Sequence, residues 1–349
     1  MKIGFGIIGL GMISEFHAKA LQETASANLN ACYSADPDKA NRFSIKYKCK
    51  PYSDLHSFLK DPKIEVISIC TPSGAHMEPA LAAIEAGKHL IIEKPIEITK
   101  ERYNRILEAA EKKEVKVAGI FPSRFMYASI IMKEAIKNNR IGRIVLGNAY
   151  VKWYRSNQYY QEGGWHGTQK LDGGGALMNQ SIHAIDLLQW LIGPVIEVYG
   201  VTSTLGHSNI EVEDIGVATV KFANGAVGTI EGTTAAYPGF EKNIAIFGSE
   251  GSIISVNDQI QTWELKNQKA KDSTIIKDSK LSDSKSGGAT NPTDINYEGH
   301  KLQFEDLCQA LKFNRKPKVD GFEATKAIQI ILAIYESSLI GQPVKLPSN

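Results

Sequence analysis

Apolar and polar positions in the first third of the chain follow two alternating periods. Residues 3–8 form an almost wholly apolar run, which indicates a buried strand, and residues 13–23 carry apolar side chains at the spacing of an amphipathic helix. A second apolar strand is expected at residues 29–33. Further helices are expected at 37–47, 79–86 and 99–113, and further strands at 66–70, 89–93 and 115–120. Strands separated by helices of this length predict an α/β domain built on a doubly wound parallel sheet.

The pattern changes beyond residue 121. The segment 195–265 is rich in β-branched residues, and Asn224-Gly225 stands between two alternating runs, which is a strong hairpin signal. We expect an α+β domain on a large, open and mostly antiparallel sheet, so that residues 1–121 and 122–349 form separate domains. The other elements expected in this second domain are helices at 128–138, 176–191, 303–312 and 322–339, a strand at 144–154, and surface strand and loop over 266–293.

Composition agrees with two soluble domains. The chain has 349 residues, more than one hydrophobic core usually serves, and 43% of them are hydrophobic and 22% charged. The formal net charge of +2 and the lack of a dense Lys/Arg run argue against a nucleic-acid partner. No apolar run has the length of a membrane span. The four cysteines are scattered without a C-x-x-C pair, so we expect reduced thiols and a cytoplasmic protein.

The turn between the first strand and the first helix carries the sequence Gly9-Leu10-Gly11-Met12-Ile13-Ser14. In this strand–turn–helix context, Gly9 permits a tight turn and Gly11 lets the backbone approach a pyrophosphate. The first helical residues, Met12 and Ile13, would present N–H groups to that anion, and Ser14 stands where a third glycine is usual. An ordinary turn is the alternative. With the second strand in place, we expect a dinucleotide-binding site.

The end of the second strand bears on which dinucleotide is bound. Enzymes that use NAD often place Asp or Glu there against the ribose hydroxyls, whereas this chain has Ser34. Ser34 does not exclude a 2′-phosphate, but no arginine follows to bind one, and Asp36 would repel it if it faces the pocket. We therefore expect NAD, with NADP as the alternative.

Two further strand ends carry polar side chains, and ligands of such sheets bind beyond the carboxyl ends of the strands. Thr71, Pro72 and His76 follow one strand and would lie beside the cofactor, while Glu93 and Lys94 end the next, directly before Pro95. Lys94 could be an ordinary solvated loop lysine. It lies where a nicotinamide ring would be expected, however, and there it could act as an acid or base.

In the second half, Gly173-Gly174-Gly175 precedes an expected helix on which Asn179, His183 and Asp186 share one face. That face is either partly solvated or part of an active site, and a neighbouring nucleotide domain favours the second reading. Candidate substrate-binding residues are Lys152, Tyr154, Trp165, His166 and Tyr237, because aromatic rings suit pyranose faces and cations suit hydroxyls or carboxylates. Each could instead be a core or interface residue. The eight histidines form no cluster at metal-ligand spacing, so we expect no metal.

The glycine turn, Thr71-Pro72 with His76, Glu93-Lys94-Pro95, and the glycine run with Asn179 and His183 occur in the same order and at similar spacing in one family. The chain resembles, over its whole length, the Gfo/Idh/MocA family of glucose–fructose oxidoreductase, inositol dehydrogenase and rhizopine-catabolism proteins. The resemblance implies an N-terminal Rossmann domain and NAD(P)-dependent oxidation or reduction of a sugar, sugar acid or cyclitol. It also implies that Lys94 and His183 flank the reacting carbinol, where substrate and nicotinamide meet between the domains.

One residue departs from the pattern of many members. The inositol dehydrogenases have aspartate four residues before the histidine, and here it is Asn179. Because an asparagine cannot take up a proton as a carboxylate does, we expect Asn179 to hydrogen-bond the substrate. Members that oxidise the 3-hydroxyl of UDP-linked N-acetylglucosaminuronic acid resemble this chain in having asparagine there.

Two other classes of function stay open. The chain could be a non-catalytic NAD(P)-binding sensor, or a glycosidase- or lyase-like enzyme that is redox-neutral and regenerates its dinucleotide in each turnover. In all three cases we expect a homodimer or homotetramer, because the open sheet needs its outer face covered.

Overall fold

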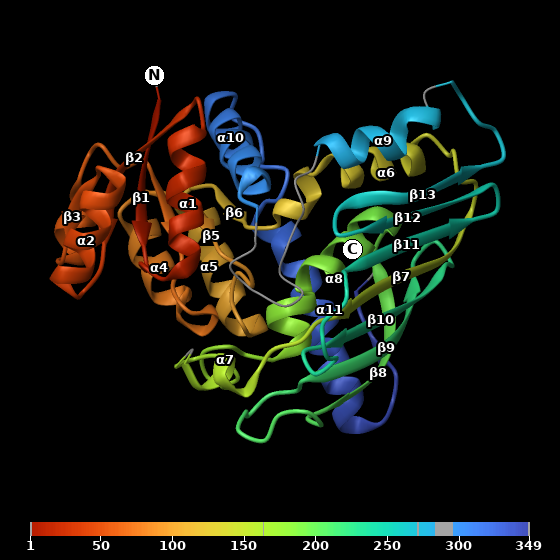
Figure 1. Ribbon diagram of the computed structural model, residues 1–349. Coiled ribbons are helices and arrows are strands. Elements are labelled where there is room, and N and C mark those ends of the chain that lie inside the picture. Colours follow the sequence, from red (N-terminus) through yellow and green to blue (C-terminus); the bar gives the residue numbers. More distant parts are fainter. Residues whose placement is uncertain (1, 163, 271, 283–295, 348–349) are drawn as a thin grey trace. The chain divides into compact units, whose positions relative to one another are not determined.

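The computed structural model describes residues 2–162, 164–270, 272–282 and 296–347. It divides into two compact units, each with its own sheet (Figure 1). Unit 1 comprises Met1–Pro122 and Tyr297–Thr325, and unit 2 comprises Ser123–Asn296 and Lys326–Asn349.

Unit 1 is built on a six-stranded parallel sheet in the order β3-β2-β1-β4-β5-β6. The central strands are apolar on both faces because helices cover both, as a parallel sheet requires. The order reverses between β1 and β4, which places the end of β1 at the topological switch point where such sheets bind nucleotides. The strands are β1 (Ile3–Ile8), β2 (Ala27–Tyr33), β3 (Lys50–Tyr52), β4 (Val66–Ile69), β5 (His89–Ile92) and β6 (Val117–Gly119).

Helices α2 and α5 of unit 1 begin with side-chain caps. Asp36 caps α2 through Asp38 N–H and Lys39 N–H, and Thr99 caps α5 through Arg102 N–H. The predicted bounds are confirmed within a few residues, whereas β3 and the short α3 were not predicted. The helices are α1 (Met12–Glu23), α2 (Pro37–Tyr47), α3 (Leu55–Lys60), α4 (Met77–Glu85) and α5 (Lys100–Lys112).

A late helix, α10 (Glu298–Lys312), completes unit 1 and lies beside α1 (Figure 1). Phe304 of α10 is fully buried and packs edge-on against Phe5 of β1, with 5.5 Å between the ring centroids. Gln303 accepts a hydrogen bond from Phe121 N–H, so α10 also holds the end of the parallel sheet. The division of the chain at residue 121 is therefore corrected, because residues 297–325 return to the first unit.

Unit 2 contains an eight-stranded sheet in the order β13-β12-β11-β7-β10-β9-β8-β14, in which the β7–β10 pair is the parallel one. The predicted hairpin at Asn224-Gly225 is confirmed: it joins β9 to β10, and Gly225 has a φ of 86°. The strands are β7 (Ile144–Lys152), β8 (Val195–Ser203), β9 (Ile215–Phe222), β10 (Val227–Thr233), β11 (Asn243–Gly248), β12 (Gly251–Val256), β13 (Gln259–Leu265) and β14 (Val344–Lys345).

One face of this sheet is covered by helices. The predicted helix at 176–191 is present as a π-helical segment, η3 (Ala176–Ser181), continued by α8 (Ile182–Ile192). Leu188 and Ile192 of α8 pack against Gly147 of β7, where a side chain would clash. The other helices are α6 (Tyr127–Lys137), α7 (Asn157–Glu162), α9 (Asp272–Ser282) and α11 (Gly321–Ile340).

Helix α9 overturns one expectation, because residues 266–293 were expected to form surface strand and loop. Its first residue, Asp272, accepts hydrogen bonds from the Arg140 guanidinium at 2.7 Å and from Trp263 Nε1–H at 3.1 Å. These long-range contacts fix the helix start, which local sequence does not signal. Residues 283–293 of the same prediction lie outside the described residues.

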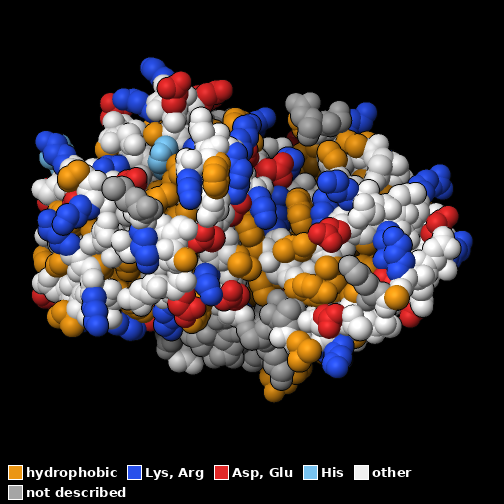
Figure 2. Space-filling model, turned by 90° about the horizontal axis from the view of Figure 1, so that it is seen from above, with side chains coloured by type: hydrophobic (Ala, Val, Ile, Leu, Met, Phe, Trp, Pro, Cys, Tyr) orange, Lys and Arg blue, Asp and Glu red, His pale blue; other side chains and the backbone are white. Residues whose placement is uncertain are grey.

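The opposite face of the sheet in unit 2 is exposed and partly apolar. Side chains alternate strictly along β9, with Ala218 and Val220 buried and Val217 46% exposed. Val201 of β8, directly opposite Val217, is 59% exposed. On the face of the molecule seen in Figure 2, basic and acidic side chains are interspersed. Within the described residues, none of the helices is long and apolar enough to cross a membrane.

Candidate active site

The turn after β1 has the geometry of a phosphate cradle. Gly9 has a φ of 86°, and a Cβ there would stand 2.6 Å from Thr71 N, so only glycine fits. Gly11 is different, because a Cβ would meet nothing within 4 Å among the described residues. No side chain in this part of the structure caps α1 at Gly11, which leaves the N–H groups of its first turn without a side-chain cap. An anionic pyrophosphate fits these donors and the partial positive charge of the helix end.

At the end of β2, both polar groups that could meet a ribose are engaged locally. Asp36 N–H donates to Ser34 Oγ at 3.2 Å, and Asp36 Oδ1 accepts from Asp38 N–H and Lys39 N–H. The carboxylate of Asp36 therefore serves as the cap of α2, and Ser34 is the residue left at the strand end.

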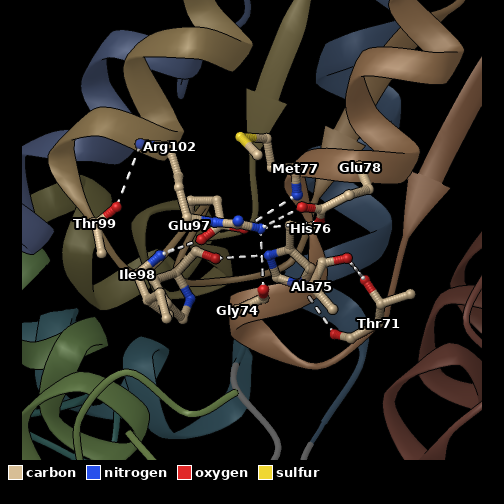
Figure 3. A network of polar contacts seen from close by, with 11 residues as sticks. Thr71, Gly74, Ala75, His76, Met77, Glu78, Glu97, Ile98, Thr99 and Arg102 are labelled. Atoms are coloured by element: carbon tan, nitrogen blue, oxygen red, sulfur yellow. Dashed lines mark hydrogen bonds and ion pairs between the residues drawn. The ribbon is translucent and has the colours of Figure 1, made fainter. Parts of the chain in front are cut away.

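The loops that follow β4 and β5 are tied together by a buried polar network (Figure 3). His76, which is 1% exposed, places Nε2 2.9 Å from Thr71 O and Nδ1 2.9 Å from Pro95 O. The predicted cofactor-binding role of His76 would therefore be indirect, because both ring nitrogens contact backbone carbonyls. Burial lowers the pKa of His76, against the nearby Glu97 carboxylate, which raises it.

Glu97 and Arg102 connect the same two loops a second time. The fully buried Glu97 carboxylate accepts hydrogen bonds from Met77 N–H, Ile98 N–H and Arg102 Nη2 at 2.8–3.1 Å. Arg102 also donates to Gly74 O, and Figure 3 shows its guanidinium reaching both segments. Sequence reasoning missed Glu97 and Arg102, since neither belongs to the motif residues beside them.

Glu93, the residue before Lys94, is buried and held from three directions. Its Oε1 lies 2.7 Å from His17 Nε2 and 3.8 Å from His300 Nε2, and its Oε2 accepts the Lys94 backbone N–H at 3.0 Å. Although burial alone would raise the pKa of this carboxyl, its hydrogen bond to His17 and the nearby His300 hold the pKa well below the usual range. Glu93 therefore binds the backbone of Lys94 as a carboxylate, and its predicted role in cofactor binding would be through that backbone.

His17, Glu93 and His300 are also close enough to share a metal ion, since their ligand atoms lie within 4.8 Å of one another. The 2.7 Å contact between His17 and Glu93 has the length of a charge-assisted hydrogen bond. His17 Nδ1 is engaged as well, by Ser68 Oγ at 2.7 Å. We interpret the cluster as a hydrogen-bonded core that anchors Glu93.

In unit 2, Asn179 lies in the π-helical segment after the glycine run, a local geometry that is frequent at functional sites. Its Nδ2 donates to Asp172 Oδ1 at 2.5 Å, and its Oδ1 accepts from Gln180 Nε2 at 3.0 Å. Asp172 is 1% exposed and also accepts Gly167 N–H. A buried carboxylate, Asp172, thus holds the amide of Asn179; sequence reasoning missed it because a glycine loop separates the two residues.

The shared face predicted for Asn179, His183 and Asp186 divides into two environments. Asp186 is 1% exposed and accepts two hydrogen bonds from the Arg124 guanidinium, at 2.7 and 2.6 Å. This bidentate pair gives Asp186 a structural role. His183 stands one turn before it, at the start of α8.

The glycine run is held by a second buried carboxylate, Glu213, which sequence reasoning also missed. Glu213 accepts Gly175 N–H and Leu177 N–H at 2.8 Å and Tyr335 Oη–H at 2.9 Å. Burial raises the pKa of Glu213 above its usual value. A Cβ at Gly175 would stand 1.8 Å from Glu213 O, so the approach of the two segments requires glycine.

The predicted substrate-binding aromatics fall into two pairs. His166 stacks on Tyr159 with 4.7 Å between ring centroids and contacts Trp165. Tyr159 Oη accepts from Gln180 Nε2, which joins this pair to the Asn179 segment. The other pair is Tyr154 and Tyr237, edge-to-face at 5.3 Å, with Tyr237 77% exposed.

Lys152 is placed elsewhere. Its amine pairs with Glu231 at 2.9 Å and lies over the Tyr150 ring, on the exposed face of the sheet. Since η3 packs on the other face, against Gly232, this placement argues against a shared site for Lys152 and Asn179.

A depression of about 540 Å³ in unit 2 lies behind the glycine run. The predicted substrate residues are not among its lining residues, which are Gln169, Gly173, Gly174, Thr202, Ser203, Thr204, Glu211, Val212, Glu213, Tyr335, Ser338 and Leu339.

Comparison with known proteins agrees with this geometry. Residues 3–121 match the model of an oxidoreductase family with an NAD-binding Rossmann fold, and residues 130–254 match the GFO/IDH/MocA C-terminal domain. The chain is 28% identical over 261 residues to a myo-inositol 2-dehydrogenase from Thermotoga maritima, covering 72% of this chain and 75% of that one.

Two solved structures are similar over the whole chain. The WlbA dehydrogenase from Bordetella pertussis, in complex with NADH and UDP-GlcNAcA, has a TM-score of 0.91 and 31% identity, covering 100% of this chain and 99% of that one. A levoglucosan dehydrogenase in complex with NADH and levoglucosan has a TM-score of 0.87 and 26% identity, with 99% and 100% coverage. The chain therefore belongs to the GFO/IDH/MocA family of oxidoreductases, and its first unit contains that family's NAD-binding Rossmann domain.

Proposed function

We propose that the protein is an NAD-dependent dehydrogenase that oxidises a ring hydroxyl of a sugar acid, with the 3-hydroxyl of a UDP-linked N-acetylhexosaminuronic acid as its target. The observation that carries the proposal is the similarity over the entire chain to a dehydrogenase solved with NADH and UDP-GlcNAcA. Asn179, where inositol dehydrogenases have aspartate, supports the same substrate class.

The proposed chemistry divides between the dinucleotide and side chains of the protein. NAD, held at the glycine turn by Gly9 and Gly11, supplies the hydride acceptor when it is bound. Lys94 takes up the hydroxyl proton as the hydride leaves, and Glu93 fixes the lysine backbone for that task. His183 and Asn179 orient the substrate hydroxyls, while Asp172 holds the amide of Asn179.

A cyclitol or an anhydrosugar is the second candidate substrate, since the relatives include a myo-inositol dehydrogenase and a levoglucosan dehydrogenase. A sensor and a redox-neutral glycosidase- or lyase-like enzyme are the other functions that the sequence left open. Both would give no net NADH.

The test is a parallel assay of NAD reduction with four compounds: UDP-N-acetylglucosaminuronic acid, UDP-N-acetylglucosamine, myo-inositol and levoglucosan. We expect NADH with the first, and a ketone at carbon 3 by NMR. Stoichiometric single-turnover measurements reveal a cofactor that stays bound. Faster reduction with myo-inositol or levoglucosan would move the proposal to the second candidate, and no NADH with any sugar would overturn dehydrogenation.

Dissociation constants for NADH and NADPH decide the cofactor preference. Neither Ser34 nor its neighbours offers a cation for a 2′-phosphate, so NADH should bind more tightly than NADPH. We also propose that the protein is a homodimer or homotetramer joined through the exposed face of the sheet in unit 2.

A further inference from the structure

The loop between β5 and α5 carries Lys94, and its backbone is fixed on both sides of that residue. On the amino side, Glu93 Oε2 accepts the Lys94 N–H at 3.0 Å. On the carboxyl side, the carbonyl of Pro95 lies 2.9 Å from His76 Nδ1. His76 belongs to the preceding loop, nineteen positions earlier, and its ring is 1% exposed. A side chain far along the chain thus meets the peptide next to the lysine.

The contacts of His76 are unusual for a buried imidazole. A neutral ring has one N–H donor and one acceptor nitrogen, yet both nitrogens of His76 face carbonyl oxygens at 2.9 Å. A neutral ring can therefore donate to one of the two oxygens at a time, either Pro95 O from Nδ1 or Thr71 O from Nε2. Which tautomer is present decides which loop the histidine holds.

The network around Glu97 separates this role from simple loop closure. Glu97 accepts Met77 N–H from one loop and Ile98 N–H from the other, and Arg102 donates to Glu97 and to Gly74 O. These bonds join the two loops independently of His76 (Figure 3). What His76 adds is its contact with the carbonyl of Pro95.

We propose that His76 is a positioning residue for Lys94: its Nδ1–H donates to Pro95 O and fixes the backbone from which the lysine amine extends. This inference rests on the proposed function in one respect, namely that Lys94 moves the proton of the substrate hydroxyl. His76 acts through the peptide after Lys94. Loss of the His76 side chain should therefore displace the Lys94 amine and leave the binding of the pyrophosphate at Gly9 and Gly11 unchanged. A misplacement of about 1 Å can cost about a hundredfold in rate.

Two conservative variants test the two ring nitrogens separately. In His76→Asn the side-chain amide nitrogen stands near the place of Nδ1, and in His76→Gln it stands near that of Nε2. His89→Gln is the matched control, because His89 begins the same strand β5 at its opposite end and its Nδ1 accepts Lys116 N–H. We expect His76→Asn and His89→Gln to keep kcat within about threefold of wild type, and His76→Gln to lose about ten- to a hundredfold. All three should bind NADH like the wild type.

A second readout does not depend on any substrate. Competitive acetylation across a pH series, followed by peptide mass spectrometry, measures the reactivity of the Lys94 amine in each variant. We expect the labelling profile of Lys94 to shift in His76→Gln and to match wild type in His76→Asn. If the wild type oxidises no sugar, the proposed function fails, and this profile still decides the role of His76. Equal profiles in the Asn and Gln variants, or rescue by Gln alone, would overturn the proposal.

A measurement on the unaltered protein covers the case in which both variants fail to fold. With histidine labelled by ¹⁵N, the chemical shifts of the two ring nitrogens report which of them carries a proton. We expect a proton on Nδ1 of His76, in the neutral or the protonated ring. A bare Nδ1 would show that the histidine does not donate to Pro95 O, and the proposal would be abandoned.

Discussion

Lys94 is the residue on which the proposed chemistry depends most directly. The Glu93 carboxylate accepts its backbone N–H, and the carbonyl of the next residue, Pro95, contacts His76, so the backbone on both sides of Lys94 has a side-chain partner. Groups that transfer a proton in the transition state typically contribute about a hundred- to ten-thousandfold to the rate.

Lys94→Ala should therefore lower kcat by about that factor and leave the affinity for NADH nearly unchanged, because the pyrophosphate cradle lies at Gly9 and Gly11. Single-turnover hydride transfer and dinucleotide binding, measured side by side, check this expectation. His183→Ala should also lower kcat, by less if its task is orientation. Near wild-type reduction of NAD by Lys94→Ala would show that the lysine is structural.

His17 contributes to the pH dependence of stability, as does His76, whose pKa burial also lowers. Burial lowers the pKa of His17 from the ordinary 6.5, so the unfolded chain binds a proton at a higher pH than the folded one. The contribution of the neutral His17 to the free energy of unfolding is complete above pH 6.5. It is lost as the pH falls through the lowered pKa of His17 in the folded protein. The slope is at most about 1.4 kcal/mol for each pH unit.

Denaturant unfolding between pH 7.5 and 5.5 should therefore show a smaller loss of stability in His17→Gln than in wild type. The exposed His56 provides the control, and His56→Gln should keep the wild-type slope. A wild-type slope in His17→Gln would mean that other groups cause the pH dependence.

Among the elements, α8 is joined to the segment before α6 by the buried pair of Asp186 and Arg124. Breaking one partner of such a pair leaves an uncompensated buried charge, which typically costs about 3–5 kcal/mol. Arg124→Met should destabilise unit 2 by about that amount, and the double variant Arg124→Met with Asp186→Leu should recover much of it. Equilibrium unfolding of the single and double variants measures the interaction energy between Arg124 and Asp186. An equal loss of unfolding free energy in the single and the double variant would contradict the prediction.

The elements also show what the sequence could and could not predict. Helix α2 was predicted to the residue because Pro37 marks its start and its apolar face is regular. Helix α9 was missed because contacts outside the helix fix its start. Asp272 is held by Arg140, which is distant in the sequence, and by Trp263, which belongs to a strand. The family pattern proposes the motif residues Lys94, Asn179 and His183 as site residues, and their role stays a prediction. Asp172, Glu97 and Glu213 could not be predicted, because only folding brings their carboxylates to the residues they hold.

At the scale of the whole molecule, the exposed face of the sheet in unit 2 is the surface expected to join copies of the chain. Val201 and Val217 stand opposite each other on that face, and Tyr199 and Val227 are 45% and 48% exposed. Contiguous exposed apolar side chains on a sheet usually mark an interface.

We expect sedimentation of the wild type at micromolar concentration to give a dimer or tetramer, and Val217→Glu to shift it toward the monomer. Ile45→Glu is the control, since Ile45 is 79% exposed on α2 of unit 1 and should leave the mass unchanged. A monomeric wild type would contradict the proposed interface.

The return of α10 to unit 1 has a consequence for how the nascent chain matures. Strand β1 and helix α1 leave the ribosome first, but Phe304, which buries Phe5, is made more than two hundred and ninety residues later. Domains generally fold as units during synthesis. Here the cofactor-binding domain cannot complete its core until nearly the whole polypeptide has emerged, and Phe5 of β1 stays incompletely buried until then. A chain cut short at residue 296 would thus lose both α10 and α11, and Phe5 of the first strand would lose the contact with Phe304.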